Sequence, residues 1–451
     1  MTYDDMRDKL APDLFLSDSQ VDERYAKDWS EAVAHLPEVV LRPRTLDDLS
    51  SMLTLAQQTG QRLVTQGGRT GLAGGATPQQ SEWALTTERM NNIIEIDPIG
   101  KTITVESGVT LQQIQEAAAE HDLMFPLDLG ARGTATAGGI ASTNAGGNQV
   151  IHYGVTRHLI LGMTAVLPDG RIMAQDNKLL KNNAGFDLKQ LMIGTEGVLG
   201  VIASVTFRLF ARRDYVKTAF CAATDFDAVT DLLFFASRKL PGLSSFEVLW
   251  EDYLLEISAV TDKAEIFSSS YPFIVLLEVE SARPSDEVEE TLQQALETGL
   301  IADALIAQNE TQRQEFWGYR DAIAEILGDM APNINFDIGI PITKMKSFTQ
   351  DVTRDLKQAF PTIRQVTFGH IGDGNLHLCC TSGNEADQVP IEDLVFAKAT
   401  AIGGTITAEH GIGVLKKPWL KDCRTADEIA LMRQLKEMMD PAMILNKGRV
   451  I

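Results

Sequence analysis

The sequence predicts an α+β protein of two or three domains. Its 451 residues exceed one ordinary domain, and 44% apolar with 23% charged residues is the composition of a folded globular chain. The first third alternates short strand patterns with helix patterns. Glycine is dense up to about residue 200, sparse afterwards and frequent again after about residue 395. We therefore expect domains over residues 1–212, 213–395 and 396–451.

The charge and the cysteine content indicate in which cellular compartment the protein works and which classes of partner it does not bind. The chain carries 62 acidic and 40 basic residues, a formal net charge of −22. Such a surface repels nucleic acid and anionic lipid, so an anionic substrate needs a local basic pocket. The first ten residues, MTYDDMRDKL, lack the basic and apolar stretches of a secretory signal, and no apolar run is long enough to span a bilayer. Four cysteines without a C-x-x-C pair favour a reducing, cytoplasmic setting.

The first expected unit is a strand, a helix and a second strand that leads into a glycine loop. Residues 39–41 form an apolar strand. Thr45 is placed to cap a helix whose apolar residues recur at helical spacing from Leu46, and Gly60 is placed to end it. Residues 62–65 return to strand, and a glycine cluster follows directly.

A second unit follows the same order. A strand at 103–106 precedes a helix that starts near Leu111, and a long glycine-containing loop covers 128–147. A strand at 163–167 then ends in a Pro-Asp-Gly turn. The last expected helix covers 427–439.

Three glycine loops carry the first functional signal. They are Gln66-Gly67-Gly68-Arg69-Thr70-Gly71 with its continuation to Gly75, the stretch 133–147, and Gly194-Thr195-Glu196-Gly197 with its continuation to Gly200. Small residues let backbone N–H groups converge on an anion. Any one loop alone is better explained as a tight turn. None has the G-x-G-x-x-G of a nicotinamide site or the G-K-[ST] of a triphosphate loop, so three together predict a long ligand with a pyrophosphate.

With Glu106-Ser107-Gly108-Val109 and the segment 181–188 (KNNAGFDL), these loops resemble the FAD-binding oxidase and transferase family. That family includes D-lactate dehydrogenases, D-2-hydroxyglutarate dehydrogenases and the glycolate oxidase flavoprotein subunit. The resemblance runs in order through nearly the whole chain. It implies a two-part FAD-binding domain of the p-cresol methylhydroxylase (PCMH) type with non-covalent FAD, a substrate domain built on an antiparallel sheet with helices, and a C-terminal segment that returns to the flavin.

The resemblance also implies which residues contact FAD. These are Gln66, Gly67, Gly68, Arg69, Thr70, Gly71 and Leu72 around the pyrophosphate, Thr134, Gly138, Ser142, Asn144 and Gly147 along the isoalloxazine and ribityl side, Glu196, Gly197 and Ile202 in the adenine half, and Asn446 from the C-terminal segment.

A histidine-containing hairpin carries the second signal. In Gly369-His370-Ile371-Gly372-Asp373-Gly374-Asn375-Leu376-His377, the Asp-Gly pair predicts a two-residue turn, which places His370 directly opposite His377. Their Cβ atoms would then lie about 4.5–5.5 Å apart, close enough to share a metal ion. Two polar cross-strand neighbours are an equally good explanation of the histidines alone. Glu409 and His410, in a glycine-flanked loop, favour the metal site.

The resemblance assigns roles to these residues. The family pattern G-H-x-G-D-G-N-L-H supplies two histidine ligands and A-E-H-G supplies a glutamate, which implies His370, His377 and Glu409 as ligands here. The set suits zinc, manganese or iron, and zinc is the ion we expect. Asn375 is expected to contact substrate. Cys379, on the same strand face as His377, is expected to form pocket wall and not to bind the ion.

An arginine that follows a tryptophan by three residues is the third signal. Trp317 and Arg320 lie three residues apart on an expected helix and share a face. An isolated arginine is usually a surface residue, but the resembled family has W-x-x-R here and binds the substrate carboxylate with it. Two positions depart from the hydroxyglutarate enzymes: Ala324 stands for a threonine and Asn335 for a lysine. Hydroxyglutarate is therefore not favoured over smaller or polyhydroxylated acids.

Taken together, these signals predict an FAD-dependent, metal-assisted dehydrogenase of a D-2-hydroxy acid. Arg320 would bind the acid, and His410 would take the hydroxyl proton. The acceptor would be an electron-transfer flavoprotein, a quinone or similar, and a homodimer stays open. Two alternatives also stay open: a flavin-binding subunit of a larger complex, and a non-redox FAD transferase of the ether-lipid synthase type.

Overall fold

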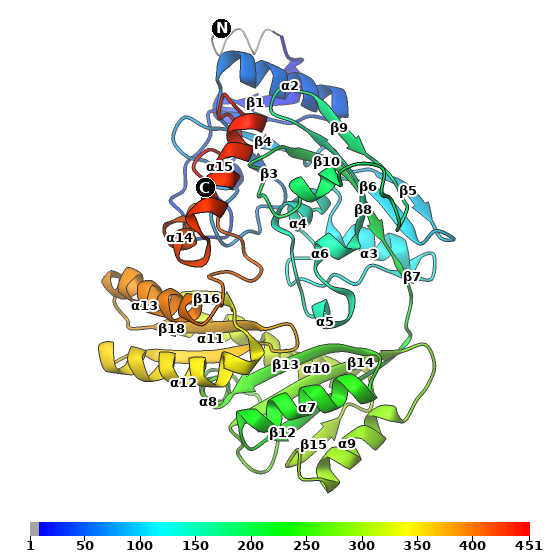
Figure 1. Ribbon diagram of the computed structural model, residues 1–451, viewed down its shortest axis with the longest axis vertical. Coiled ribbons are helices and arrows are strands. Elements are labelled where there is room, and N and C mark those ends of the chain that lie inside the picture. The colour runs from blue at the N-terminus through cyan, green and yellow to red at the C-terminus, as the bar shows by residue number, and fades with distance from the viewer. Residues whose placement is uncertain (1–8) are drawn as a thin grey trace. The chain divides into compact units, whose positions relative to one another are not determined.

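The chain crosses between two units at four points. The computed structural model describes residues 9–451, so residues 1–8, most of the segment expected to carry no secretory signal, lie outside the described chain. Unit 1 contains the chain up to Gly147, Gly154–Arg212 and Glu409–Ile451, and unit 2 contains Asn148–Tyr153 and Arg213–Ala408. Figure 1 colours the elements in chain order. Within the described chain, no helix combines the length and apolar composition needed to cross a membrane.

The first sheet of unit 1 confirms the predicted strand–helix–strand unit. Its order is β1-β2-β4-β3, parallel except for β1. The strands are β1 (Phe15–Ser17), β2 (Val39–Leu41), β3 (Leu63–Gln66) and β4 (Trp83–Thr86). Between β2 and β3 lies α2 (Leu46–Thr59), which begins with a capping box between Thr45 and Asp48 and ends at Gly60 with φ 72°.

The second sheet of unit 1 is antiparallel, with order β5-β6-β10-β8-β9. Its strands are β5 (Ile93–Asp97), β6 (Thr102–Glu106), β8 (Ile160–Val166), β9 (Ile172–Gln175) and β10 (Val201–Arg208). Beside it lie α3 (Leu111–Ala119), α4 (Ala137–Thr143), α6 (Thr156–Leu159) and the short pair β7 (Leu123–Met124) and β11 (Phe210–Ala211). The strand expected at 103–106 and the helix expected from Leu111 are confirmed.

Residues after Glu409 complete the core of unit 1. They form α14 (Leu420–Cys423) and α15 (Ala426–Met439), and then an extended tail. Leu445 pairs with Leu63 of β3, and its side chain is fully buried in the core that contains α2. The Arg449 guanidinium is also fully buried and lies 2.9 and 2.7 Å from the two carboxylate oxygens of Glu82.

Unit 2 is built on one seven-stranded antiparallel sheet with order β15-β12-β14-β13-β17-β18-β16, as expected for the substrate domain. The strands are β12 (Tyr215–Ala223), β13 (Leu243–Trp250), β14 (Phe273–Ser281), β15 (Asp303–Ile306), β16 (Ile334–Gly339), β17 (Arg364–His370) and β18 (Asn375–Thr381). The helices are α7 (Phe226–Lys239), α8 (Glu251–Val260), α9 (Glu287–Glu297), α10 (Glu310–Asp321), α11 (Ile323–Asp329), α12 (Ile342–Ala359) and α13 (Gln388–Ala401).

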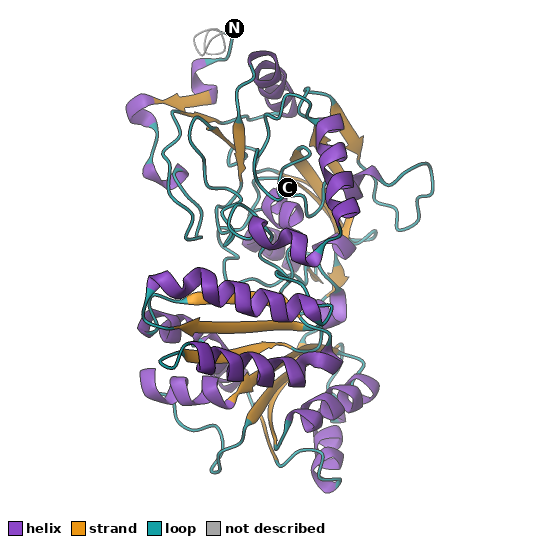
Figure 2. Ribbon diagram, turned by 60° about the vertical axis from the view of Figure 1, so that its left-hand side comes forward, coloured by secondary structure: helices purple, strands orange, loops and turns teal. Residues whose placement is uncertain are grey.

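The two faces of this sheet carry different helices. α7, α12 and α13 cover one face, and Figure 2 shows helices lying along the strands of this sheet. On this face Phe336 of β16 contacts Phe396 of α13. α8, α10 and α11 cover the other face, where Tyr253 and Ile326 pack with Phe368 in one core cluster. The segment α5 (Val150–Tyr153) also belongs to unit 2, since the hydroxyl of Tyr153 donates to Glu280 of β14 at 2.7 Å.

Candidate functional site

A cavity of about 400 Å³ lies in unit 1 and is lined by all three glycine loops. Twelve of the residues expected to contact FAD line it: Gln66, Gly67, Gly68, Arg69, Thr70, Gly71, Leu72, Gly138, Ser142, Glu196, Gly197 and Ile202. Asp28 and Thr87, which the sequence did not indicate, also contribute to the wall, and so do Glu409 and His410. The cavity thus gathers residues from both ends of the chain.

The first loop presents unused hydrogen-bond donors to this cavity. Within the described chain, none of the backbone N–H groups of residues 67–72 donates to a protein acceptor. The amide nitrogen of Gln66 donates to the carbonyls of Tyr25 and Ala76, while its oxygen is buried and has no hydrogen-bond partner. Free backbone N–H groups can donate to the oxygens of a pyrophosphate, and the buried Gln66 oxygen can accept from a hydroxyl or N–H group of the same ligand.

The first and second loops touch backbone to backbone. A Cβ atom built on Gly68 would lie 2.0 Å from the carbonyl oxygen of Thr134, so only glycine fits at this position. Arg69, at φ 57°, places its guanidinium over the Tyr25 ring at 5.1 Å, and burial lowers its pKa. The loops therefore form a preassembled wall.

Glu196, in the third loop, connects the cavity wall to the C-terminal segment. Its carboxylate accepts hydrogen bonds from the N–H groups of Ile412 and Gly413 at 2.7 and 2.9 Å, and burial raises its pKa. These two residues follow His410 closely, so Glu196 fixes the loop that carries this histidine. The carboxylate is thus engaged with protein backbone in addition to lining the cavity.

Four residues expected at FAD lie outside the cavity lining: Thr134, Asn144, Gly147 and Asn446. Asn144 accepts from the N–H of Arg157. Asn446 accepts from the N–H of Thr65 at 2.8 Å and donates to the carbonyl of Glu196. The geometry gives both asparagines a supporting position behind the loops.

In unit 2, a partly buried arginine lies beside a buried histidine. Arg320, near the end of α10, places Nη2 3.2 Å from Nε2 of His370 and Nε 3.4 Å from Oε2 of Glu247. Oε1 of Glu247 lies 2.5 Å from Nδ1 of His370. Burial alone would raise the pKa of Glu247, but the neighbouring His370 and Arg320 lower it. Trp317, one turn earlier, donates to Glu278 on the same sheet face, which confirms that Trp317 and Arg320 share a face.

The hairpin brings His370 and His377 together, but the predicted register is wrong. Phe368, not His370, pairs with His377, because residues 371–374 form a four-residue loop. In it Asp373 N–H donates to the carbonyl of His370, Gly374 N–H donates to that of Ile371, and Gly374 adopts φ 85°. Residues 371 and 372, which a two-residue turn would leave in the strand, therefore belong to the loop.

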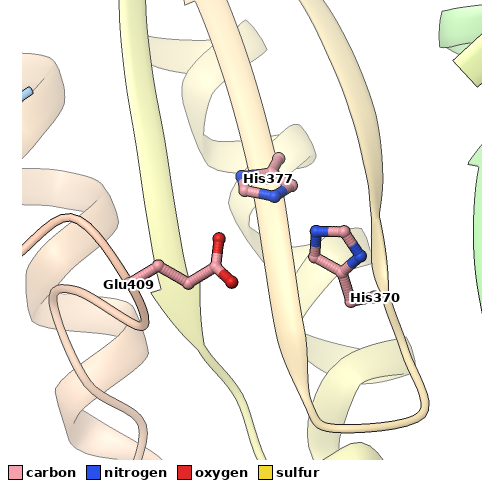
Figure 3. A group of neighbouring side chains, drawn as sticks. All are labelled: His370, His377 and Glu409. Atoms are coloured by element: carbon pink, nitrogen blue, oxygen red, sulfur yellow. The ribbon is translucent and has the colours of Figure 1, made fainter. Parts of the chain in front are cut away.

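The error is two residues, and side chains alternate with a period of two, so both histidines still share one face. Their ring centroids lie 5.3 Å apart at 80°. Figure 3 shows the two imidazoles and the Glu409 carboxylate as neighbours. One ligand atom from each of these three side chains lies within 4.8 Å of the others.

Glu409 directly follows Ala408, the last residue of unit 2. The N–H of Ala408 donates to both the carbonyl and the carboxylate of Asp337, which stands opposite His377 on β16. Two neutral imidazoles and a carboxylate are a donor set that fits a divalent ion with coordination positions left open.

Asn375 and the remaining predicted positions lie around this group. The Asn375 amide nitrogen donates to Asp337 at 2.6 Å, and its oxygen is buried without a partner. Cys379 is buried in the core cluster under α8 and α11, and burial raises its pKa. Asn335 is exposed and donates to Asn333.

Sequence reasoning missed Glu247. Its signal was a single glutamate within the apolar strand FEVLW of β13, because a charged residue there must find a buried partner. Only the pairing of β13 with β17 shows that His370 is this partner.

Comparisons with known proteins cover both units. An FAD binding domain model matches residues 37–174, and the model of the FAD linked oxidases, C-terminal domain, matches residues 212–450. The D-2-hydroxyglutarate dehydrogenase of Xanthomonas citri pv. viticola is 33% identical over 440 residues, covering 95% of this chain and 92% of its own. The chain belongs to the FAD-linked oxidase family.

Other relatives of this FAD-dependent oxidoreductase support its assignment to the same family. The putative mitochondrial D-lactate dehydrogenase of Schizosaccharomyces pombe is 34% identical over 429 residues, 92% of this chain and 82% of its own. Two solved structures share the fold of this FAD-linked oxidase. p-Cresol methylhydroxylase with substrate bound has a TM-score of 0.77 at 15% identity, covering 98% of this chain and 95% of its own. Alkyldihydroxyacetonephosphate synthase has a TM-score of 0.76 at 16% identity, covering 99% and 85%. The PCMH-type fold is thereby confirmed.

Proposed function

We propose that the protein is a metal-assisted dehydrogenase that oxidises a D-2-hydroxy acid to the 2-oxo acid with FAD. The observation that carries the proposal is the Arg320 side chain, which is 15% exposed and places Nη2 3.2 Å from Nε2 of His370, on the sheet face that also carries His377. A guanidinium fork binds a planar carboxylate, and the histidines suit the ion that would bind the 2-hydroxyl. The names of the relatives, D-2-hydroxyglutarate and D-lactate dehydrogenases, support this reaction class and the D configuration.

Each group in the site has its own role in the proposed oxidation. When bound in unit 1, FAD would supply the hydride acceptor, and a divalent ion, zinc by preference, held by His370, His377 and Glu409 would lower the pKa of the hydroxyl. Arg320 binds the carboxylate. Asn375, held by Asp337, offers its free buried oxygen to the substrate.

His410 takes the hydroxyl proton in this proposal. It lines the cavity of unit 1, and Glu196 fixes the loop that follows it. A base must stay within hydrogen-bond reach of one position, so a loop held by two backbone hydrogen bonds is a suitable support.

The substrate proposal favours smaller or polyhydroxylated acids over hydroxyglutarate. Asn335, where the resembled hydroxyglutarate enzymes carry a lysine, is exposed and bonded to Asn333, and Ala324 has no polar group. An electron-transfer flavoprotein or quinone as acceptor, and a cytoplasmic location, stay predictions of the sequence.

A transferase role is less well supported. Alkyldihydroxyacetonephosphate synthase is 16% identical, a likeness that shows the fold alone. The dehydrogenase relatives are about twice as similar along almost the whole chain.

Dye reduction by the purified protein tests the proposal. Lactate, glycerate, malate, gluconate and 2-hydroxyglutarate would be supplied in both D and L forms, with and without Zn²⁺, and released FAD would be measured after denaturation. We expect stoichiometric FAD and reduction by a D acid. A preparation that stays colourless when supplied with FAD, or an FAD-loaded protein that no 2-hydroxy acid reduces, would contradict it.

A further inference from the structure

One buried carboxylate contacts both the arginine and a histidine of the proposed site. Glu247 projects from β13, and its side chain is 1% exposed. Its Oε1 lies 2.5 Å from Nδ1 of His370, and its Oε2 lies 3.4 Å from Nε of Arg320. One carboxylate oxygen thus contacts the imidazole of His370, and the other contacts the guanidinium of Arg320.

The contact with His370 determines which ring nitrogen faces the ligand side. Glu247 and His370 are direct partners in the β13–β17 register, so this short contact is built into the sheet. A hydrogen bond from Nδ1–H to the carboxylate leaves Nε2 with its lone pair outward, and a metal-bound imidazole needs this arrangement. In this structure Nε2 of His370 lies 3.2 Å from Nη2 of Arg320, so an ion bound at Nε2 would take the lone pair that this hydrogen bond uses.

The contact with Arg320 fixes the guanidinium in the same way. The hydroxyl of Tyr253 donates to the carbonyl of Arg320 at 2.7 Å, which anchors the end of α10. The guanidinium lies over the Phe368 ring at 5.2 Å. With its Nε directed at Glu247, Arg320 places Nη2 toward His370, while Nη1 lies 3.9 Å from Oδ1 of Asp321.

From this geometry we infer that Glu247 is a positioning residue that couples ion binding at His370 to carboxylate binding at Arg320. The inference rests on the proposed function, because it assumes that these two groups bind an ion and a substrate. Because the one carboxylate contacts both groups, we expect a change at Glu247 to weaken both events.

A second buried glutamate on the same face provides a matched control. Glu278 of the neighbouring β14 is 2% exposed and accepts hydrogen bonds from Arg313 and Trp317 of α10. It anchors the same helix through residues other than Arg320. A general loss of packing should therefore follow from either substitution, whereas loss of ion binding should follow only from a change at Glu247.

The experiment compares Glu247→Gln, Glu247→Asp and Glu278→Gln with the wild type, all as full chains loaded with FAD. Zn²⁺ affinity is measured by competition with a chromophoric chelator, and KM is measured at saturating Zn²⁺ with the best acid from the dye-reduction screen. We expect Glu247→Gln to weaken Zn²⁺ binding about 10–100-fold and to raise KM. Glu247→Asp, which keeps the charge, should recover part of both, and Glu278→Gln should keep the wild-type Zn²⁺ affinity.

The outcomes separate this inference from the function it rests on. Wild-type Zn²⁺ affinity in Glu247→Gln, or an equal loss in Glu278→Gln, would overturn the positioning role while leaving the dehydrogenase intact. A wild-type protein that binds no Zn²⁺, Mn²⁺ or Fe²⁺ would overturn both the metal site and the coupling. If Glu247→Gln loses its FAD or fails to fold, the aspartate variant decides: weaker Zn²⁺ binding together with a raised KM supports the positioning role, and a wild-type value of either quantity contradicts it.

Discussion

Replacing Gly68 with alanine tests how closely the first two glycine loops pack. The new Cβ would lie 2.0 Å from the carbonyl oxygen of Thr134, whereas carbon–oxygen contacts need about 3.3 Å, so the loops must separate by about 1.3 Å. Hydrogen bonds tolerate only about 0.5 Å of variation, so the N–H groups of this loop would lose a bound phosphate. Two charge-assisted bonds lost at about 1.5–3 kcal/mol each predict FAD binding weaker by about 10²–10⁴-fold.

Gly71→Ala is the matched control in the same loop. The nearest atom to its Cβ would be Oδ2 of Asp28 at 3.7 Å, an ordinary contact, so the apoprotein should melt close to wild type. FAD affinity of Gly68→Ala is measured by flavin fluorescence in titrations of the apoprotein, and Tm of both apoprotein variants by scanning fluorimetry. A Gly68→Ala protein that binds FAD within about threefold of wild type would refute the packing argument.

Three further perturbations test other parts of the molecule. Arg320→Ala should lower kcat/KM by about two to three powers of ten without changing FAD content, whereas Arg364→Ala, at an exposed arginine paired with Glu256, should leave kcat/KM unchanged. Equal turnover of the two variants would place the carboxylate clamp elsewhere. Chelation should abolish flavin reduction by substrate with little change in the FAD spectrum or Tm. A divalent ion should restore it, and His377→Ala should behave like the chelated protein; full activity of verified metal-free protein would end the metal hypothesis. Arg449→Ala leaves the Glu82 carboxylate buried and unpaired, so the free energy of unfolding should fall by about 3–5 kcal/mol, as measured by denaturant titration. A smaller loss in the single variant than in Arg449→Met with Glu82→Leu would contradict this.

Local sequence signals predicted local structure well. The capping box at Thr45 and the αL glycine at 60 determine α2 through contacts within a few residues, and both are visible in the sequence. The glycine loops were recognisable for the same reason, because close backbone approach excludes side chains wherever it occurs. These features depend on neighbours along the chain.

Features that depend on pairing between distant strands were less accessible. The turn at 371–374 was predicted as two residues because Asp-Gly is compatible with several loop lengths, and pairing with β16 and β13 decides among them. Glu247 escaped notice because its partner is 123 residues away. The prediction that His370 and His377 share a site was still correct, because side chains on a strand alternate between the two faces of the sheet. A register error of two residues therefore leaves both histidines on one face.

The contact between Thr65 and Asn446 joins positions 381 residues apart, and this has a consequence for biosynthesis. A ribosome delivers β3 early, but Leu445, which pairs with that strand, leaves the exit tunnel only after all of unit 2. Domains fold as they emerge, so unit 2 can complete its sheet while unit 1 still lacks part of its core. Nascent chains stalled before residue 440 should therefore lack the assembled cavity, and acquisition of FAD would mark polypeptides whose translation has passed Arg449.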